Sequence, residues 1–292
     1  MIDKYKYRYT VTAADMAADY TLTPNAILMY AQDCFARMMT QCHVAAFDVV
    51  NDNRMWVISE YTANIGTATA FWSEEVDVEL WVSELTPLRV YIDFRIVRAD
   101  SQLTVATGSF QMNILNSQTH RIAPTDFLQG RFNVIPEMMT PSHKKALFPK
   151  AETPLIVTEH TVTRLDVDFN GHMGNRSYVD LALLSLPDST LQNKRLKSMT
   201  VHWLHESRLG DVLRCKTCAV PSSDDLFLHT ITNADQSTVC ELLTQWQTAS
   251  STPDIAKSLV RNPQTLKPSN PQTLKPCNPQ TISSSATQQK TT

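Results

Sequence analysis

The sequence predicts an α+β protein built from two similar halves. Segments that alternate polar and apolar residues, rich in Val, Ile, Tyr and Phe, follow one another along most of the chain, as antiparallel strands do. One segment in each half instead repeats its apolar residues at helical spacing. The order of one strand, one helix and a run of long strands occurs twice, which indicates an internal duplication.

The first half should begin with a strand at residues 5–11. A helix is expected from Pro24, a residue suited to the first helical turn, through apolar positions to Met38. Long strands with period-two alternation then follow at residues 55–61, 75–84, 88–98 and 103–115.

The second half repeats this order. A strand at residues 155–162 leads into a polar segment, and a helix is expected after it, ending before Pro187. The remaining strands are expected at residues 198–205, 211–219, 226–233 and 237–247.

These patterns divide the chain into four parts. An N-terminal domain is expected at residues 1–128 and a C-terminal domain at 153–250, joined by a linker at 129–152 that is rich in proline and lacks periodicity. Residues 251–292 form a tail in which the sequence Asn-Pro-Gln-Thr-Leu-Lys-Pro recurs. Such a tail cannot bury enough apolar surface to offset its ordering entropy, so disorder is expected there.

Composition narrows the class of protein. The chain has 292 residues, 42% of them hydrophobic and 19% charged, as in soluble globular proteins. A formal net charge of -3 without a basic stripe argues against a nucleic-acid partner. No apolar run reaches the length of a membrane span, and the charged N-terminus does not resemble a secretion signal. We therefore expect a cytoplasmic protein.

The six cysteines are scattered, which favours reduced thiols over a disulfide framework. Cys215 and Cys218 form a Cys-x-x-Cys pattern, but a zinc site would need two further ligands nearby. The pair also lies in an expected strand, where a redox motif is unusual. Neither a metal nor a cofactor is expected.

The most informative segment is RLDVDFNGHMGNRSY, at residues 164–178. Four polar side chains alternate along it: Asp166, Asp168, Asn170 and His172. In an extended segment these four would point to one side, and the residues between them, Leu165, Val167 and Phe169, would face the core.

Glycine supports a functional interpretation of this segment. The chain has only 6 glycines in 292 residues, yet Gly171 and Gly174 bracket His172. Glycine is favoured where the backbone turns sharply or approaches a ligand, and the helix that follows would offer free N–H groups to an oxyanion. A hydrolase site fits these groups. A purely structural interpretation also fits, with Asn170 and Gly171 forming a turn and the aspartates either solvated or capping a helix.

With these elements placed, the chain resembles the acyl-acyl carrier protein thioesterases over about residues 3–250. The resemblance includes LTPLRVYIDF at 85–94, LDVDFNGHMGNRSY at 165–178 and MTVHWLHES at 199–207. It implies two tandem hotdog domains, each a long helix wrapped by an antiparallel β-sheet. The N-terminal domain would bind the acyl chain and the C-terminal domain would be catalytic.

The resemblance also implies a set of site residues. The family's Asp, Asn and His at alternate positions, and the Glu of the next strand, fall on Asp168, Asn170, His172 and Glu206. The expected substrate-binding positions, at the start of the helix, are Gly174, Asn175 and Tyr178. Plant members commonly have a cysteine after the Glu; Ser207 stands there in this chain, which argues against a mechanism that needs a thiol.

The implied reaction is hydrolysis of the thioester between a fatty acyl chain and the phosphopantetheine arm of acyl carrier protein, the expected partner. Glu206 or Asp168 would act as general base, while His172 and Asn170 would orient the water or the thioester carbonyl. An acyl-CoA thioesterase of the same fold and a non-catalytic acyl-binding hotdog protein are the alternatives. A Gly-x-Ser-x-Gly elbow of serine hydrolases is absent.

Further residues have weaker claims. His202 would share a strand face with Glu206, although a structural role is favoured. A carrier protein could be bound by the basic residues Lys194, Arg195 and Lys197. An acyl tunnel could be lined by Trp56, Trp72, Trp81, Met38 and Met39, although plain core is favoured. Two fused domains already supply the usual hotdog dimer interface, so the oligomeric state stays open, a homodimer included.

Overall fold

The structure is a computed structural model that describes residues 4–18, 20–140, 148–150, 153–221 and 223–248. Residues 1–250 form one compact unit. The tail predicted at 251–292 lies outside the described residues, and the predicted domain boundaries stay a prediction.

The first half contains the predicted strand, helix and meander. Its strands are β1 (Tyr5–Thr10), β2 (Arg54–Ile65), β3 (Glu75–Leu85), β4 (Val90–Arg98), β5 (Thr104–Asn116) and the short β6 (Ile122–Ala123). Its helices are α1 (Pro24–Gln41) and α2 (Ala46–Val49), with short 3₁₀ turns at η1 (Ala13–Asp15), η2 (Val50–Asp52) and η3 (Asp126–Leu128).

The second half has the same order with shorter connections. Its strands are β7 (Ile156–Thr161), β8 (Lys194–Trp203), β9 (Val212–Val220), β10 (Ser223–Thr232) and β11 (Thr238–Thr248). Its helices are α3 (Asn175–Leu184) and α4 (Asp188–Asn193). The expected strand at 198–205 begins earlier and also ends earlier, because the chain turns away after Trp203. This early end matters for the site.

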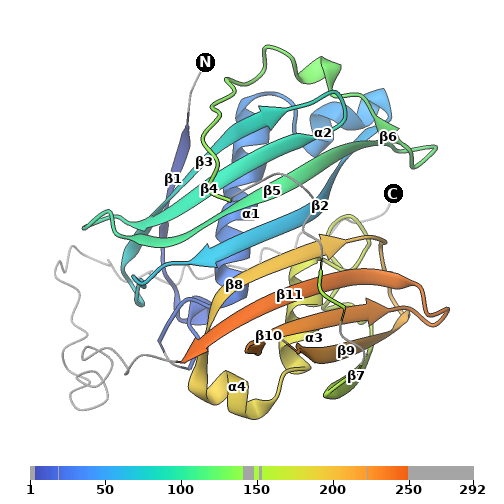
Figure 1. The fold of residues 1–292 in the computed structure, drawn as a ribbon. Coiled ribbons are helices and arrows are strands. Elements are labelled where there is room, and N and C mark those ends of the chain that lie inside the picture. Colours follow the sequence, from blue (N-terminus) through green and yellow to red (C-terminus); the bar gives the residue numbers. More distant parts are fainter. Residues whose placement is uncertain (1–3, 19, 141–147, 151–152, 222, 249–292) are drawn as a thin grey trace, which may run out of the picture. The chain divides into compact units, whose positions relative to one another are not determined.

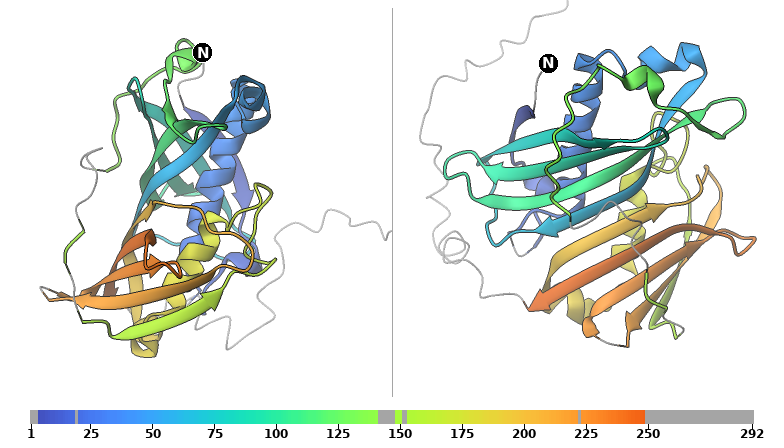
Figure 2. Two further views of the ribbon diagram at one scale, coloured as in Figure 1. Left: turned by 90° about the vertical axis from the view of Figure 1, so that its right-hand side faces the viewer. Right: turned by 45° about the horizontal axis from the view of Figure 1, so that its top comes forward.

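The described strands form one antiparallel sheet in the order β1-β3-β4-β5-β2-β8-β11-β10-β9-β7, with β6 paired to β5. The two halves meet where β2 pairs with β8, and Thr62 lies opposite Thr200 at the middle of this seam. Helices α1 and α3 cover one face of the sheet (Figures 1 and 2). At the helix interface the Asn25 amide donates a 2.5 Å hydrogen bond to Asp180 Oδ1.

The core lies between the helices and the sheet. Leu28, Ala31 and Met38 on α1 are fully buried against the sheet. Tyr61 and Phe94 stack beneath this helix with ring centroids 5.9 Å apart. Each large apolar side chain contributes roughly 1.5–3 kcal/mol on burial, so the apolar face of α1 is a major source of stability.

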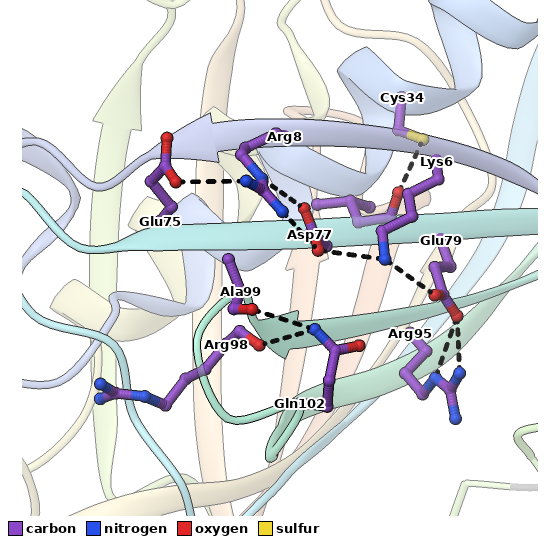
Figure 3. Close-up of polar contacts among 11 residues, drawn as sticks. Lys6, Arg8, Cys34, Glu75, Asp77, Glu79, Arg95, Arg98, Ala99 and Gln102 are labelled. Carbon is purple, nitrogen blue, oxygen red and sulfur yellow. Dashed lines mark hydrogen bonds and ion pairs between the residues drawn. The ribbon is translucent and has the colours of Figure 1, made fainter.

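Alternating charges lie on one face of the sheet, across the edge strand β1 and its neighbours β3 and β4 (Figure 3). Asp77 on β3 accepts hydrogen bonds from Arg8 Nε at 2.8 Å and Arg8 NH2 at 3.1 Å, and Lys6 Nζ lies 3.0 Å from it. Glu79, two residues further along β3, pairs with Arg95 at 2.6 Å. Charged side chains on an edge discourage pairing with strands of other molecules.

The described part of the predicted linker runs along the face of the sheet opposite the helices (Figure 2). Ile135 N donates to Val82 O at 2.9 Å, and Trp81 Nε1 donates to Glu137 O at 2.8 Å. Further along, Met139 N donates to Asp93 Oδ1 at 2.6 Å. The segment therefore crosses the surface as expected, held by hydrogen bonds to β3 and β4.

The internal duplication is confirmed by matching hydrogen bonds in the turns before α1 and α3. Asp15 Oδ2 accepts from Thr12 N and Oγ1 at 2.8 and 2.6 Å, and Asp166 Oδ2 accepts from Thr163 N and Oγ1 at 2.7 and 2.6 Å. The bridge from Met16 to Leu22 has its counterpart in the bridge from Val167 to Met173. Equivalent residues can therefore be compared one by one.

Candidate active site

The polar segment before α3 is a tight hairpin, so the prediction of an extended segment with four polar side chains on one side is wrong. Asp168 N donates to His172 O at 2.9 Å, and Gly171 N donates to Asp168 O at 3.0 Å. Gly171 closes the turn with φ +80°, a conformation that residues with a Cβ rarely adopt. Asn170 and Gly171 therefore form the turn that the structural interpretation predicts, and the same hairpin also carries polar side chains of the candidate site.

The side chains between the polar positions do not all face the core as expected. Leu165 is 96% exposed and Phe169 is 91% exposed, because the hairpin projects both of them into solvent. Val167 is the exception and packs against the core. Alternation along the sequence therefore gave the wrong environment for two of three apolar residues.

Asp166 has a structural role. Besides its bonds from Thr163, its carboxylate lies 3.0 Å from His160 Nε2. Burial acts to raise the pKa of Asp166, but the hydrogen bonds from Thr163 and His160 outweigh it and hold that pKa below its usual value. The carboxylate fixes the entry into the hairpin and does not cap α3, so its role is structural but not the helix cap of the structural interpretation.

His172 and Glu206 meet at the end of the sheet. His172 Nε2 lies 2.9 Å from Glu206 Oε2, and the other oxygen, Oε1, accepts from Arg208 NH2 at 2.8 Å. The side chains of His172 and Glu206 are 23% and 40% exposed, so water reaches the pair. Arg208 was not foreseen, although its position two residues after Glu206 is the signal that could have indicated it.

Backbone hydrogen bonds hold these two residues together. Met173 N, next to His172, donates to Ser207 O, next to Glu206, at 2.8 Å. Glu206 is in the loop after β8 and not in the strand itself, so the expectation that it shares a strand face with His202 is wrong. His202 instead lies 3.1 Å from Glu60 across the seam and stacks on Phe148.

Asp168 and Asn170 form a second pair on the same hairpin. Asp168 Oδ1 accepts from Asn170 N at 2.8 Å, and its Oδ2 is 3.5 Å from Asn170 Nδ2. A Cβ placed on Gly174 would lie 3.5 Å from Asp168 Cβ, so this carboxylate sits over the start of α3. Among the described residues no side-chain hydrogen bond joins this pair to His172 and Glu206, although Asp168 N donates to His172 O.

The starts of the two helices differ in a way that favours a ligand at α3. Thr23 caps α1 by accepting a bond from Ala26 N, and Pro24 removes a backbone donor there. Gly174 precedes α3 without any side-chain cap, and Asn175 and Arg176 begin the helix with N–H groups. Uncapped donors and the positive end of the helix dipole suit a developing oxyanion.

Two buried hydroxyls lie behind this helix start. Tyr178 and Ser207 are 2% and 1% exposed, and neither hydroxyl has a well-aligned hydrogen-bond partner among the described side chains. Burial raises the pKa of Tyr178 to about 12, although the nearby Ser207 acts in the opposite direction. Tyr178, which the sequence analysis placed among the substrate-binding residues, is therefore buried and stays protonated at neutral pH.

The first half lacks the imidazole and its acidic partner at the equivalent positions. Matching bonds from Phe71 N to Glu74 and from Arg208 N to Asp211 align the loops after β2 and β8. The residues equivalent to Asp168, His172 and Glu206 are then Ala17, Thr21 and Thr69. The same backbone thus exists twice. The first copy has Asp19 at the position of Asn170, but only the second copy carries an imidazole with an acidic partner.

Several other predicted positions are accounted for elsewhere. Trp81 is fully buried and bonds the linker, Trp72 is 52% exposed, and Trp56 donates to Val44 O. Met38 and Met39 belong to the core under α1.

The five described cysteines are free. In the described ranges no cluster of His, Cys, Asp and Glu is placed to hold a metal, and no helix there is long and apolar enough to cross a membrane.

Comparisons with known proteins show which proteins this chain is similar to. Residues 150–248 match the family model of the acyl-ACP thioesterase C-terminal domain. The chloroplast acyl-[acyl-carrier-protein] hydrolase FATB1 of Cuphea viscosissima is 19% identical over 262 residues, which are 83% of this chain. The chain spans 61% of the length of that relative.

Solved structures confirm the predicted fold. The acyl-ACP thioesterase of Bacteroides thetaiotaomicron superposes with a TM-score of 0.74 at 19% identity, over 84% of this chain and 98% of that protein. The 12:0-ACP thioesterase of Umbellularia californica gives a TM-score of 0.76 at 17% identity, over the same shares of the two chains. The two tandem hotdog domains predicted from the sequence are therefore present.

Proposed function

We propose, from the membership of residues 150–248 in the acyl-ACP thioesterase family, that this chain hydrolyses the thioester of a fatty acyl group carried by acyl carrier protein. The observation that carries the proposal is the 2.9 Å contact between His172 and Glu206 beside the uncapped start of α3. The products would be a free fatty acid and the carrier protein with its free thiol. Fatty acid synthesis on that carrier would then end.

His172 is suited to act as the general base. When Nε2 carries a proton shared with Glu206, Nδ1 is the free basic nitrogen and can take a proton from water. The Glu206 carboxylate would then stabilise the imidazolium that forms, while Arg208 holds the carboxylate in place. The sequence analysis named Glu206 or Asp168 as the general base. The contact between His172 and Glu206 favours a different role for Glu206, which is to orient the imidazole of His172.

The attacked carbonyl needs stabilisation of its developing negative charge. The first N–H groups of α3, at Asn175 and Arg176, are the candidates for this role. Asp168 and Asn170 stiffen the hairpin, and the exposed Asn170 amide would orient the carbonyl or the water. When the intermediate collapses, His172 returns the proton to the sulfur. A thiol has a pKa of ~8.5, so its departure needs little further assistance.

The domain roles belong to the same proposal. The N-terminal hotdog domain would hold the acyl chain, since it has no counterpart of the His172–Glu206 pair, and the C-terminal domain would carry out the chemistry. A cytoplasmic location fits a carrier-protein substrate. The acyl-CoA thioesterase and the non-catalytic acyl-binding protein are the competing functions.

The test compares variants at equivalent backbone positions of the two halves. His172→Ala and Glu206→Gln should each lower kcat by a factor of at least about 100, because the base or its orienting group is lost. The matched control, Thr21→Ala at the position equivalent to His172, should keep wild-type kcat. Circular dichroism checks that all three variants are folded. Near-normal turnover in His172→Ala would contradict the assignment.

The substrate class is decided by a panel of C8 to C18 thioesters on carrier protein and on coenzyme A, assayed by release of free thiol. A higher kcat/KM on the carrier-protein thioesters is expected. The opposite preference would favour the acyl-CoA thioesterase. Binding of both substrates without any thiol release would favour the non-catalytic protein.

A further inference from the structure

Two large apolar side chains stand in solvent beside the site. Leu165 and Phe169, at 96% and 91%, are the most exposed of the large hydrophobic residues that the structure describes. Phe169 is three residues from His172, which places their Cα atoms within about 11 Å. Fully exposed Leu and Phe side chains so close to a site are typical of an interaction surface.

The hairpin that carries them is fixed by its own bonds. Gly174 N donates to Asp166 O at 2.8 Å, in addition to the Asp168 and Gly171 bonds that close the turn. The two side chains are therefore held outward by a defined backbone. They do not serve that backbone, because the equivalent hairpin of the first half has Ala14 and Ala18 at these positions and makes the same bonds.

Basic side chains flank the apolar pair. Arg164 is exposed and makes no ion pair with any described residue, and Arg208, 65% exposed, lies in the neighbouring loop beside Glu206. That loop joins the hairpin strand through Gly210 N, which donates to Val162 O at 2.9 Å. The first half has Ala13 and Phe71 at the positions equivalent to the two arginines, so the positive charge also occurs only beside the polar site.

The acidic groups of this region already accept hydrogen bonds from the protein, including the exposed Asp168, whose carboxylate accepts from Asn170 N. Asp166 is bonded by Thr163 and His160, and Glu206 is shared between His172 and Arg208. The Asp211 carboxylate accepts from Arg208 N at 2.8 Å. An approaching partner therefore meets apolar side chains and arginine, which complement a surface that is both apolar and acidic.

We propose that Arg164, Leu165, Phe169 and Arg208 form a docking face for the acidic carrier protein that delivers the acyl thioester. This inference rests on the proposed function. A thioester on a protein-bound arm reaches His172 only when its carrier sits close to that residue. These four residues lie on the hairpin and the loop that carry His172 and Glu206. The phosphate that joins the arm to the carrier is negative and suits the two arginines.

The basic residues singled out from the sequence are less well placed for this role. Lys194 starts β8 and pairs with Asp225 at 2.5 Å. Lys197 lies six residues before Trp203, about 20 Å along the strand from the end where Glu206 follows. A carrier bound there would lie at the wrong end of the strand.

Kinetics with two forms of the same acyl group test the docking face. The double variant Leu165→Ser/Phe169→Ser and the single variant Arg164→Glu should each lose at least tenfold in kcat/KM on the carrier-protein thioester, mainly through KM. Both should stay within about twofold of wild type on the coenzyme A thioester. The matched controls are Leu184→Ser, at the far end of α3 and 71% exposed, and Lys197→Glu. Both controls should behave as wild type.

Binding of holo-carrier protein, measured by calorimetric titration, separates failure of this inference from failure of the proposed function. Weaker binding to the double variant than to wild type supports the docking face even in the absence of turnover. Unchanged binding and unchanged carrier-protein kinetics overturn it, as does an equal loss on both thioesters. Binding of wild type, but not the double variant, to anionic phospholipid vesicles with unchanged carrier kinetics would assign the face to a lipid surface.

Discussion

A buried histidine in the C-terminal domain should make the protein sensitive to acid. His229 on β10 is completely buried, with Nδ1 2.8 Å from Thr217 Oγ1 and Nε2 2.9 Å from Thr244 Oγ1. Trp246 Nε1 also donates to Thr244 Oγ1, at 3.0 Å. Burial lowers the pKa of His229 from 6.5 to about 3, and no charged group contributes to the shift. The native state therefore keeps this imidazole neutral.

The sign and size of the effect follow from proton linkage. Between pH 6.5 and pH 3 the unfolded chain binds a proton at His229 and the native state does not, so stability falls as the pH drops through this window. Each pH unit below the unfolded pKa removes about 1.4 kcal/mol. Between pH 7 and pH 5 the loss from this residue amounts to about 2 kcal/mol, a large part of the stability of an ordinary domain.

Urea unfolding of the full chain at pH 7 and pH 5 measures this loss. Replacement His229→Gln removes the titrating group, so the variant should be less stable than wild type at pH 7 but lose about 2 kcal/mol less on acidification. The control His205→Gln changes an exposed histidine and should retain the wild-type pH dependence. Equal pH dependence in wild type and His229→Gln would refute the assignment of a neutral buried imidazole.

Three further predictions concern charge, packing and the serine beside the site. The hydrogen bonds from Arg8 lower the pKa of Asp77, so the contribution of this carboxylate to the free energy of unfolding is present above the unfolded pKa and is lost as the pH falls through the lowered pKa. Asp77→Asn should therefore cost about 1 kcal/mol at pH 7 in urea unfolding, and the variant should lose less stability than wild type below about pH 4. Gly108→Ala would push a Cβ into the carbonyl oxygen of Thr62, so the unfolding midpoint should drop by the equivalent of more than about 2 kcal/mol. The control Gly130→Ala has no atom within 4 Å of the new Cβ, so its positive φ alone should lower the free energy of unfolding by about 1 kcal/mol. Ser207→Ala removes a buried hydroxyl without an aligned partner, so kcat should stay within about twofold and stability should not fall; a loss of activity comparable to that of His172→Ala would give Ser207 a chemical role.

Much of the fold followed from local patterns in the sequence. Period-two alternation located the long strands, and Pro24 marked the start of α1 where the structure places it. The duplication could be predicted because both halves repeat the same order of elements. The register that joins β2 to β8 could not, because side chains on two distant strands give no local signal of which residues will pair.

The site illustrates the limit of alternation as a signal. A run of polar and apolar residues at period two predicts a strand only when no turn intervenes, and the φ of Gly171 converts this run into a hairpin. The hairpin leaves Leu165 and Phe169 in solvent, which no periodicity could indicate. The contact between His172 and Glu206 was anticipated from the family resemblance alone, because it joins residues that are distant in sequence. The contact of Arg208 with Glu206 and the burial of the His229 imidazole also depend on how the chain folds, so local sequence patterns could not predict them.

The duplication itself supplies the strongest physical argument about function. Both halves close the same turn with the same backbone bonds, so the requirements of folding are met by Ala17 and Thr21 as well as by Asp168 and His172. A Thr cap and a Pro close the start of α1, whereas Gly174 leaves the start of α3 open. His172 and Glu206 are not needed for the backbone bonds, and they lie beside uncapped donors in only one of two equivalent loops. This difference supports the proposal that the reaction takes place at that loop. Exchange of His172 for the Thr found in the other half should therefore preserve the fold and abolish turnover.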